Sequence, residues 1–316
     1  MLDKYFYAFG RGVRGAKQAL SEVSREPDAA ETARDVTPDN LTPLPRKPLL
    51  LGARPLVMGV VNVTPDSFSD GGDFLDHGAA IAQAKRLLTE GADILDIGGE
   101  STRPGHAPVS AQDEIERVVP VLRALAASTD LPLSIDTMKA KVAEAAIDAG
   151  ASVINDVWGF QHDADMARVV AERNVPAIIM HNRHEVDASL DIMDEILRFL
   201  SRSIEIALKA GVRKEQLVVD PGFGFGVTHA QSLTMVRDLE KLKVLGLPIL
   251  LGVSRKRAIG AATGRTEPKD RMIGSVAAHL IGAMNGADII RVHDVAAHVD
   301  AMRVVAAVRY PASVEK

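Results

Sequence analysis

The chain has 316 residues, of which 47% are hydrophobic, 25% charged and 4% aromatic, with a net charge of −5 at pH 7. This composition is typical of a globular protein with a full-sized core, and the acidic balance argues against a nucleic-acid partner, because proteins that bind nucleic acids present a basic face. The absence of cysteine excludes disulfides, thiolate catalysis and thiolate metal sites, which makes the cytoplasm the expected compartment. No apolar run approaches the roughly 18 residues that a membrane-spanning helix needs, so no membrane partner is expected.

The first 55 residues are predicted to form an N-terminal extension and linker, partly disordered, ahead of a folded domain over residues 56–316. Residues 21–55 are rich in Glu, Asp, Thr and Pro, and they hold too few large apolar side chains to offset the entropy lost on folding. Residues 1–20 contain a third of the aromatic side chains of the chain. That segment either docks on the folded domain as a helix or contacts a partner or a membrane surface.

From Leu56 onward, eight short apolar runs rich in β-branched residues alternate with longer segments of helical pattern. Each run is almost continuously apolar, which is typical of parallel strands buried on both faces. The predicted strands are residues 56–63, 93–99, 132–137, 152–157, 177–181, 217–222, 248–254 and 288–294. Helical segments such as 77–91 and 189–211 lie between them, and several end at a glycine, a common helix stop.

Eight strand–helix pairs within roughly 250 residues predict a parallel α/β fold, a closed (β/α)8 TIM barrel that follows the N-terminal extension. An open, doubly wound sheet is the alternative. Such a sheet usually has fewer strands and a Gly-rich turn after the first one, and no GxGxxG motif follows residues 56–63.

All eight predicted strands end in residues that can form hydrogen bonds. In a (β/α)8 barrel the carboxyl ends of the strands meet at one rim, where the catalytic groups lie. The predicted rim residues are Asn62, 100–103, Asp136, Asn155, Asp156, His181, Asp220, 254–256, Arg291 and His293. The cations among them suit a phosphate or a carboxylate, whereas the short Asp and Asn side chains suit a heterocycle that carries both donors and acceptors.

Three segments rich in glycine or small polar residues adjoin this rim: NVTPDSFSDGG (62–72), GESTRPG (99–105) and PGFGFG (221–226). The first two are predicted to be mobile loops that close over a substrate. The third lets the backbone approach a planar ligand closely, because glycine has no side chain in the way.

Seven motifs, NVTPDSFSDGG, DIGGESTRPG, SIDT, IND, DPGFGFG, SRK and RVHD, occur in this order along the chain. The ordered set resembles the dihydropteroate synthase family of the folate pathway, over about residues 56–308. The resemblance implies a (β/α)8 barrel and a transferase that condenses 6-hydroxymethyl-7,8-dihydropterin diphosphate with 4-aminobenzoate. Dihydropteroate and diphosphate would be the products. The reaction would use Mg²⁺ as its cofactor and would depend on positioning and electrostatics rather than on a strong general base.

The resemblance also implies a role for each residue of the rim. Asn62 would bind the magnesium that accompanies the diphosphate. The diphosphate would contact Thr102, Arg291 and His293. The pterin would contact the catalytic group, which consists of Asp136, Asn155, Asp220 and Lys256. The 4-aminobenzoate would lie beside Arg103, Pro104 and Phe225. Members of the family are sulfonamide targets and are usually homodimers formed through barrel helices, which the resemblance implies here too.

Besides MHN (180–182), where MHM is usual, the chain departs from the usual family pattern at four positions. Val227 stands where lysine is usual, Gln231 and Ser232 stand where His-Asn is usual, and Arg257 stands where serine is usual. These departures concern the affinity for the second substrate and the response to sulfonamides, while the residues expected to bind the pterin are all present. Asp136 and Asp220 also have a purely structural reading, because Asp after a strand commonly caps a helix.

Two other functions stay open at this point. Methyltetrahydrofolate methyltransferases, which pass a methyl group to a corrinoid, share the pterin-binding barrel, but they do not need the pair of Arg291 and His293 or the 62–72 loop. A pterin-binding paralogue without catalytic activity would explain the four departures. It would not explain why the rim residues and both loops are kept.

Overall fold

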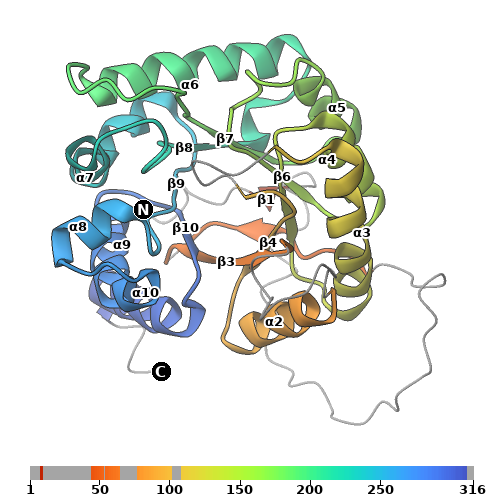
Figure 1. Ribbon diagram of the computed structural model, residues 1–316, viewed down its shortest axis with the longest axis horizontal. Coiled ribbons are helices and arrows are strands. Elements are labelled where there is room, and N and C mark those ends of the chain that lie inside the picture. The colour runs from red at the N-terminus through yellow and green to blue at the C-terminus, as the bar shows by residue number, and fades with distance from the viewer. Residues whose placement is uncertain (1–7, 10–43, 53, 65–76, 102–107, 312–316) are drawn as a thin grey trace.

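The strands of the chain form a ring that is surrounded by helices (Figure 1). The computed structural model describes residues 8–9, 44–52, 54–64, 77–101 and 108–311. Eight parallel strands are paired in the order β8-β7-β6-β5-β4-β3-β10-β9, and a parallel bridge between Val219 and Ile249 joins the two ends of this series. The predicted (β/α)8 TIM barrel is therefore confirmed, and the open sheet is wrong.

Each strand lies within the range predicted for it. The strands are β3 (Leu56–Asn62), β4 (Ile94–Gly98), β5 (Leu133–Asp136), β6 (Val153–Asp156), β7 (Ala177–Met180), β8 (Leu217–Asp220), β9 (Leu250–Leu251) and β10 (Ile289–Val292). The α-helices are α2 (His77–Thr89), α3 (Ala111–Ser128), α4 (Ala140–Asp148), α5 (Met166–Arg173), α6 (Ile192–Lys209), α7 (His229–Arg237), α8 (Arg257–Thr263), α9 (Met272–Met284) and α10 (Val295–Arg309). None of the described helices is long and apolar enough to cross a membrane.

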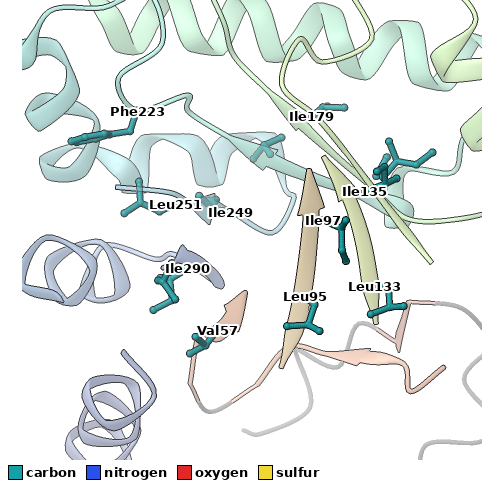
Figure 2. Packing of buried hydrophobic residues seen from close by; sticks show 14 of the residues in the cluster. Val57, Leu95, Ile97, Leu133, Ile135, Ile179, Phe223, Ile249, Leu251 and Ile290 are labelled. Carbon is teal, nitrogen blue, oxygen red and sulfur yellow. The ribbon is translucent and has the colours of Figure 1, made fainter. Parts of the chain in front are cut away.

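Alternate residues of the strands face opposite sides of the barrel wall, as the two-residue period of a β-strand requires. One set packs against the surrounding helices and includes Val57, Leu95, Leu133 and Ile290 (Figure 2). The other set points into the barrel. Near the start of the strands it forms a separate apolar cluster that contains Met58, Ile94, Val153, Ile178, Val218, Leu250 and Ile289. The lower part of the barrel interior is thus a packed core.

Two leucines that precede the barrel complete this lower cluster. Leu49 and Leu51 are both buried in it, whereas Leu50 between them is 45% exposed. The short strand β2 (Leu49–Leu50) pairs antiparallel with β1 (Ala8–Phe9). The sequence analysis placed these leucines in a linker, but in the structure they close the end of the barrel at which the strands begin.

Arg46 holds the same segment against the end of α3. Its guanidinium donates to the carbonyl oxygen of Ala126 at 3.0 Å and also to that of Thr129. The backbone N–H of Lys47 donates to Asp130 at 2.7 Å. Residues 44–51 therefore contact the barrel throughout. The boundary at residue 55 for the chain as a whole stays a prediction.

A chain that begins at Arg54 should unfold at a lower temperature than one that begins at Leu44. It lacks Leu49 and Leu51, and burial of a leucine side chain contributes about 1.5–3 kcal/mol. In a domain of this size each kcal/mol corresponds to a shift in Tm of about 2–4 °C. Calorimetry of both chains measures the difference, with Leu49→Ala and the half-exposed Leu50→Ala as a matched pair. Equal Tm values for the two chains would show that the leucines do not stabilise the barrel.

Candidate active site

Polar side chains replace the apolar ones further along the inward faces of the strands. Three buried polar residues lie two positions beyond a member of the lower cluster, namely Asp96, Asn155 and Asp220. Ser134 is also buried and pairs in register with Val153 of that cluster. Arg291 lies two residues beyond Ile289 on β10. The barrel interior is therefore apolar where the strands begin and polar where they end, and the second half is the predicted rim.

Arg291 is the centre of this polar cluster. Its Nε donates to Oδ2 of Asp96 and its Nη2 donates to Oδ2 of Asp136, both at 2.6 Å. Asn155 Nδ2 donates to the same oxygen of Asp96 at 3.0 Å. Burial acts to lower the pKa of the Arg291 guanidinium, but the two aspartates outweigh it and raise this pKa above its ordinary value. Arg291 therefore stays charged.

The buried aspartates resist ionisation. Burial raises the pKa of Asp136 to about 7, against the lowering effect of Arg291 and with a further contribution from the nearby charge of Asp96. Burial also raises the pKa of Asp220, while Lys256 and the N–H of Gly222, which donates to Asp220 Oδ1 at 2.8 Å, oppose this shift. Near neutral pH, Asp136 can thus act either as a donor or as an acceptor.

Three oxygen atoms of the cluster have no hydrogen-bond partner among the described residues. They are Oδ1 of Asp96, Oγ of Ser134 and Oδ1 of Asp136, and all three are buried. Buried polar atoms in proteins are almost always paired, so an unpaired set of this kind needs an explanation. A planar ligand with several N–H groups would supply the missing donors.

Lys256 approaches the cluster from the loop after β9. Its Nζ donates to the carbonyl oxygen of Phe223 at 2.7 Å and lies 4.5 Å from the centre of the Phe225 ring. Burial lowers the pKa of the Lys256 amine to about 8, although Asp220 acts to raise it. Lys256 and Asp220 therefore form an electrostatically linked donor and acceptor, one in the loop after β9 and the other at the end of β8.

The glycine-rich loop after β8 packs tightly against the loop after β7. Gly222 has a φ of +74°, and a Cβ atom there would lie 1.9 Å from the carbonyl oxygen of His181. Only glycine fits this position, for both reasons. Phe223 and Phe225 of this loop lie beside Lys256, and the predicted approach of its backbone to a planar ligand stays a prediction.

The other predicted residues lie further out. His293 follows β10, and its backbone N–H and its Nδ1 lie 3.1 and 3.0 Å from Oγ of Ser254. Asn62 is the last residue of β3 and is partly exposed. Thr102, Arg103 and Pro104 lie outside the described residues. Of the predicted site, the structure brings together Asp136, Asn155, Asp220, Lys256 and Arg291.

The helix-capping interpretation of the two aspartates is wrong. Lys139 is the N-cap of α4, and Thr228 is the N-cap of α7. Asp136 and Asp220 precede these caps by three and eight residues and point into the barrel instead. One residue at a departure from the family pattern has a structural role, since the side chain of Gln231 completes the cap of α7 by accepting the N–H of Thr228.

The sequence analysis missed two residues of the cluster, Asp96 and Ser134. Each is a polar residue flanked by apolar residues inside its strand, in DILDIGG and PLSIDT. The signal was present, because a strand buried on both faces has no exposed position for an aspartate. Both residues lie inside their strands rather than at the ends, where the predicted rim residues lie.

Comparisons with known proteins agree with this geometry. A family model described as pterin binding enzyme matches residues 58–293. The dihydropteroate synthase of Clostridium beijerinckii is 51% identical over 246 residues, which is 78% of this chain and 91% of that protein.

Solved structures give the same result. A Xanthomonas albilineans dihydropteroate synthase with 4-aminobenzoic acid superposes with a TM-score of 0.80 at 50% identity, over 83% of this chain and 96% of that one. The enzyme of the same organism in complex with 7,8-dihydropteroate gives a TM-score of 0.75 at 48% identity, with the same coverage. The chain therefore belongs to the pterin-binding enzymes, as a member of the dihydropteroate synthase family.

Proposed function

We propose that the polar cluster inside the barrel is where this transferase of folate biosynthesis joins 6-hydroxymethyl-7,8-dihydropterin diphosphate to 4-aminobenzoate. The observation that supports this location best is the set of three unpaired buried oxygens on Asp96, Ser134 and Asp136. A pterin presents an amino group and ring N–H groups along one edge, which are the donors these acceptors lack. The reaction releases diphosphate and forms dihydropteroate.

Asp220 and Lys256 also bind the pterin. The Asp220 carboxylate accepts from the second hydrogen of the 2-amino group and from a ring N–H, and the Lys256 amine donates to a carbonyl oxygen or ring nitrogen. Asn155, whose Nδ2 donates to Asp96 at 3.0 Å, provides a further contact to the pterin. Because these side chains are short or buried, the ring is held in one orientation, and the carbon that reacts points to the rim.

The chemistry needs no strong base. The carbon–oxygen bond to the diphosphate breaks with its electron pair going to oxygen, and the aniline nitrogen of 4-aminobenzoate then bonds to the resulting pterin cation and loses a proton. Buried carboxylates close to the ring favour the developing positive charge. His293 and Thr102 contact the leaving diphosphate, and so does Arg291, whose Nε and Nη2 are at the same time held by Asp96 and Asp136.

The second substrate has a subsite between the loops of the rim. Arg103, Pro104 and Phe225 border the 4-aminobenzoate. Of these three, the structure describes Phe225, whose ring lies beside the Lys256 amine. A dihydropteroate synthase of Yersinia pestis, 44% identical with a TM-score of 0.78, has been solved with a sulfonamide drug. We propose that sulfonamides compete for this subsite here. We also propose the cytoplasm as the location of the protein.

Asn62 fits a magnesium ion that arrives with the diphosphate. It offers one amide oxygen at the partly exposed carboxyl end of β3, and among the described residues no group of three or more His, Asp or Glu side chains forms a complete metal site. Magnesium is commonly bound by one or two protein oxygens together with substrate phosphates. When bound, the ion would neutralise charge on the departing diphosphate.

Turnover should stop in EDTA and return when Mg²⁺ is added in excess. Asn62→Ala should raise the Mg²⁺ concentration needed for half-maximal rate, because one protein oxygen ligand is lost, while calorimetric binding of a pterin without diphosphate stays unchanged. Initial rates over a Mg²⁺ titration measure this. Full activity of the unmodified chain in chelator would contradict the magnesium requirement.

We propose that the protein is a homodimer that buries the outer faces of α9 and α10. These helices pack against each other and expose large apolar residues, among them Ile273 at 78% and Val308 at 65%. Ile281, Met284 and Val304 are exposed on the same two helices. Exposed apolar patches of this kind mark interfaces between proteins.

The double variant Ile273→Asp with Val308→Asp should be a monomer, since each substitution places a charge in the contact. Light scattering after size-exclusion chromatography measures the mass. Val186→Asp is the matched control, because Val186 is similarly exposed, at 59%, but lies outside both helices. A monomeric unmodified chain would contradict the homodimer. A double variant that is still a dimer would place the interface elsewhere.

The experiment that tests the function is diphosphate release from the purified chain with the dihydropterin diphosphate and magnesium, with and without 4-aminobenzoate. Release that requires 4-aminobenzoate, together with dihydropteroate in the products, is the expected result. Binding of the pterin without release would instead favour a pterin-binding protein that lacks this reaction.

A further inference from the structure

Two buried histidines outside the polar cluster connect helices α9 and α10 to the loop that carries Lys256. His279 lies on α9 and His298 on α10, and neither is exposed. Nδ1 of His279 is 3.0 Å from Nε2 of His298, and the two rings meet edge to face with their centres 4.9 Å apart. Among the described residues, neither ring forms a hydrogen bond with a side chain of the polar cluster, although the charge of Lys256 contributes to lowering the pKa of His279.

The contacts at the two ends fix where the protons lie. Nδ1 of His298 is 2.6 Å from the carbonyl oxygen of Asp294, a distance that requires a proton on Nδ1. The Nε2 of the same ring then has a free electron pair and accepts from Nδ1–H of His279. This leaves Nε2 of His279 as an acceptor, and the backbone N–H of Val253 donates to it at 3.2 Å.

The opposite assignment is worse at the His298 end and gains nothing at the His279 end, where one contact of 3.2 Å would replace another. With the protons on Nε2, His279 would donate to the carbonyl oxygen of Leu251, also 3.2 Å away. However, an electron pair of His298 would then face the Asp294 oxygen at 2.6 Å, and the N–H of Val253 would lose its acceptor. Burial lowers the pKa of both imidazoles below the ordinary value, and for His279 the neighbouring His298 lowers it further, so both rings are neutral.

The loop that this pair holds has a strained backbone. Arg255 has a φ of +58°, in the left-handed region, which is unfavourable for a residue other than glycine because of its Cβ atom. Its N–H donates to Oγ of Ser275 at 2.9 Å, and its Nε donates to Asp294 at 3.0 Å. A strained residue persists when its surroundings determine its conformation, and such residues concentrate at functional sites.

The contacts to the loop come from two pairs of helical neighbours. Ser275 and His279 lie one turn apart on α9 and bind Arg255 and Val253. Asp294 and His298 lie one turn apart at the start of α10, where Asp294 binds Arg255 through its carboxylate and His298 through its carbonyl oxygen. Lys256 is the next residue along the chain, so these contacts determine the direction in which its side chain leaves the loop.

We propose that His279 and His298 are positioning residues for the transferase reaction: as a neutral pair with both protons on Nδ1, they fix Val253 and Asp294 and thereby aim Lys256 into the polar cluster. The role in pterin binding rests on the proposed function, whereas the protonation pattern does not. The two parts are therefore tested by separate measurements.

Nitrogen-15 NMR of the full chain with labelled histidine tests the protonation pattern. Both rings should show the neutral Nδ1–H form, with no titration between about pH 5.5 and 8.5, where an unperturbed histidine changes charge. Spectra of His279→Gln and His298→Asn assign the two signals. An Nε2–H form or a charged ring at either position would overturn the proposal, whatever the enzyme does.

The positioning role is tested by calorimetric binding of pterin and by KM for the dihydropterin diphosphate. His279→Leu removes the acceptor for Val253 and should weaken both roughly tenfold or more, since small displacements of a binding group have effects of this size. His279→Gln keeps an acceptor oxygen at the place of Nε2 and should restore them to within about threefold. Met302→Ala on α10 is the matched control, because it removes a buried side chain that has no part in the hydrogen-bond chain.

Equal weakening of pterin binding by His279→Leu and by Met302→Ala, at equal loss of Tm, would overturn the positioning role and leave the pair a purely structural one. So would a failure of His279→Gln to restore binding. If His279→Leu does not fold, His298→Asn replaces it. This variant retains a donor for the carbonyl oxygen of Asp294 but has no atom at the place of Nε2, where the ring accepts from His279. It should weaken pterin binding in the same direction, and unchanged binding would overturn the role. An unmodified chain that binds no pterin would refute the proposed function, and the NMR result would be unaffected.

Discussion

Asp220→Ala should lower kcat/KM for the dihydropterin diphosphate by on the order of a hundredfold or more. The carboxylate is buried at the end of β8, and a site built to accept hydrogen bonds loses far more than the bond energy when the acceptor is removed, because the donors of the ligand are left unpaired. Steady-state kinetics at saturating 4-aminobenzoate measures the effect.

Asp156 offers a matched control for this substitution. It is also a buried aspartate at the end of a strand, but its carboxylate accepts from the backbone N–H groups of Trp158 and Phe160, both at 2.8 Å. Asp156→Ala should therefore lower Tm and leave KM for the pterin substrate nearly unchanged in the fraction that stays folded. Kinetics that are unchanged in Asp220→Ala would remove Asp220 from the site.

Arg291→Met should destabilise the protein by about 3–5 kcal/mol near neutral pH, because removal of one partner leaves buried charges uncompensated. Asp96 and Asp136 would both lose the guanidinium that binds them at 2.6 Å. Urea unfolding measures the difference. Arg168→Met on the surface, where Arg168 is exposed to solvent and pairs with Glu172 at 2.7 Å, should leave the free energy of unfolding nearly unchanged.

The cost of Arg291→Met should also depend on pH, with a definite sign. The pKa of Asp136 is about 7 in the folded chain, above the ordinary value of 3.8, so the folded state binds more protons than the unfolded state between these values. Stability due to this group is therefore present below about pH 4 and falls as the pH rises towards 7. Without Arg291 the pKa rises further, so the variant should lose additional stability above pH 7. A cost that is the same at acidic and alkaline pH would contradict the assignment of the effect to these carboxylates.

The barrel could be predicted from the sequence because parallel strands buried on both faces leave an unmistakable pattern of short apolar runs. The rim followed from the barrel, since Asp136, Asn155 and Asp220 end their strands. Asp96 lies inside its strand, so its charge marks it as unusual but does not place it among the residues of the rim. Its significance becomes visible only when Arg291, far away in the sequence, lies beside it.

Contacts between distant segments explain the remaining differences. Leu49 and Leu51 lie in a stretch of linker-like composition, and only the open end of the barrel gives them a place to pack. The helix α8 is short and follows directly after the loop that carries Lys256, so it is too short to show the apolar periodicity by which a helix is predicted. His279 and His298 lie on different helices, and nothing in the sequence shows that their rings face each other.

The bonds of Arg291 also bear on how the protein is made. Its two partners, Asp96 and Asp136, precede it by 195 and 155 residues, and all three belong to different strands. During synthesis both carboxylates leave the ribosome before the guanidinium does, because β10, which pairs with β3 and β9, is the last strand of the ring to be made. A nascent chain that stops short of β10 therefore holds the two aspartates without the cation that binds them in the finished barrel.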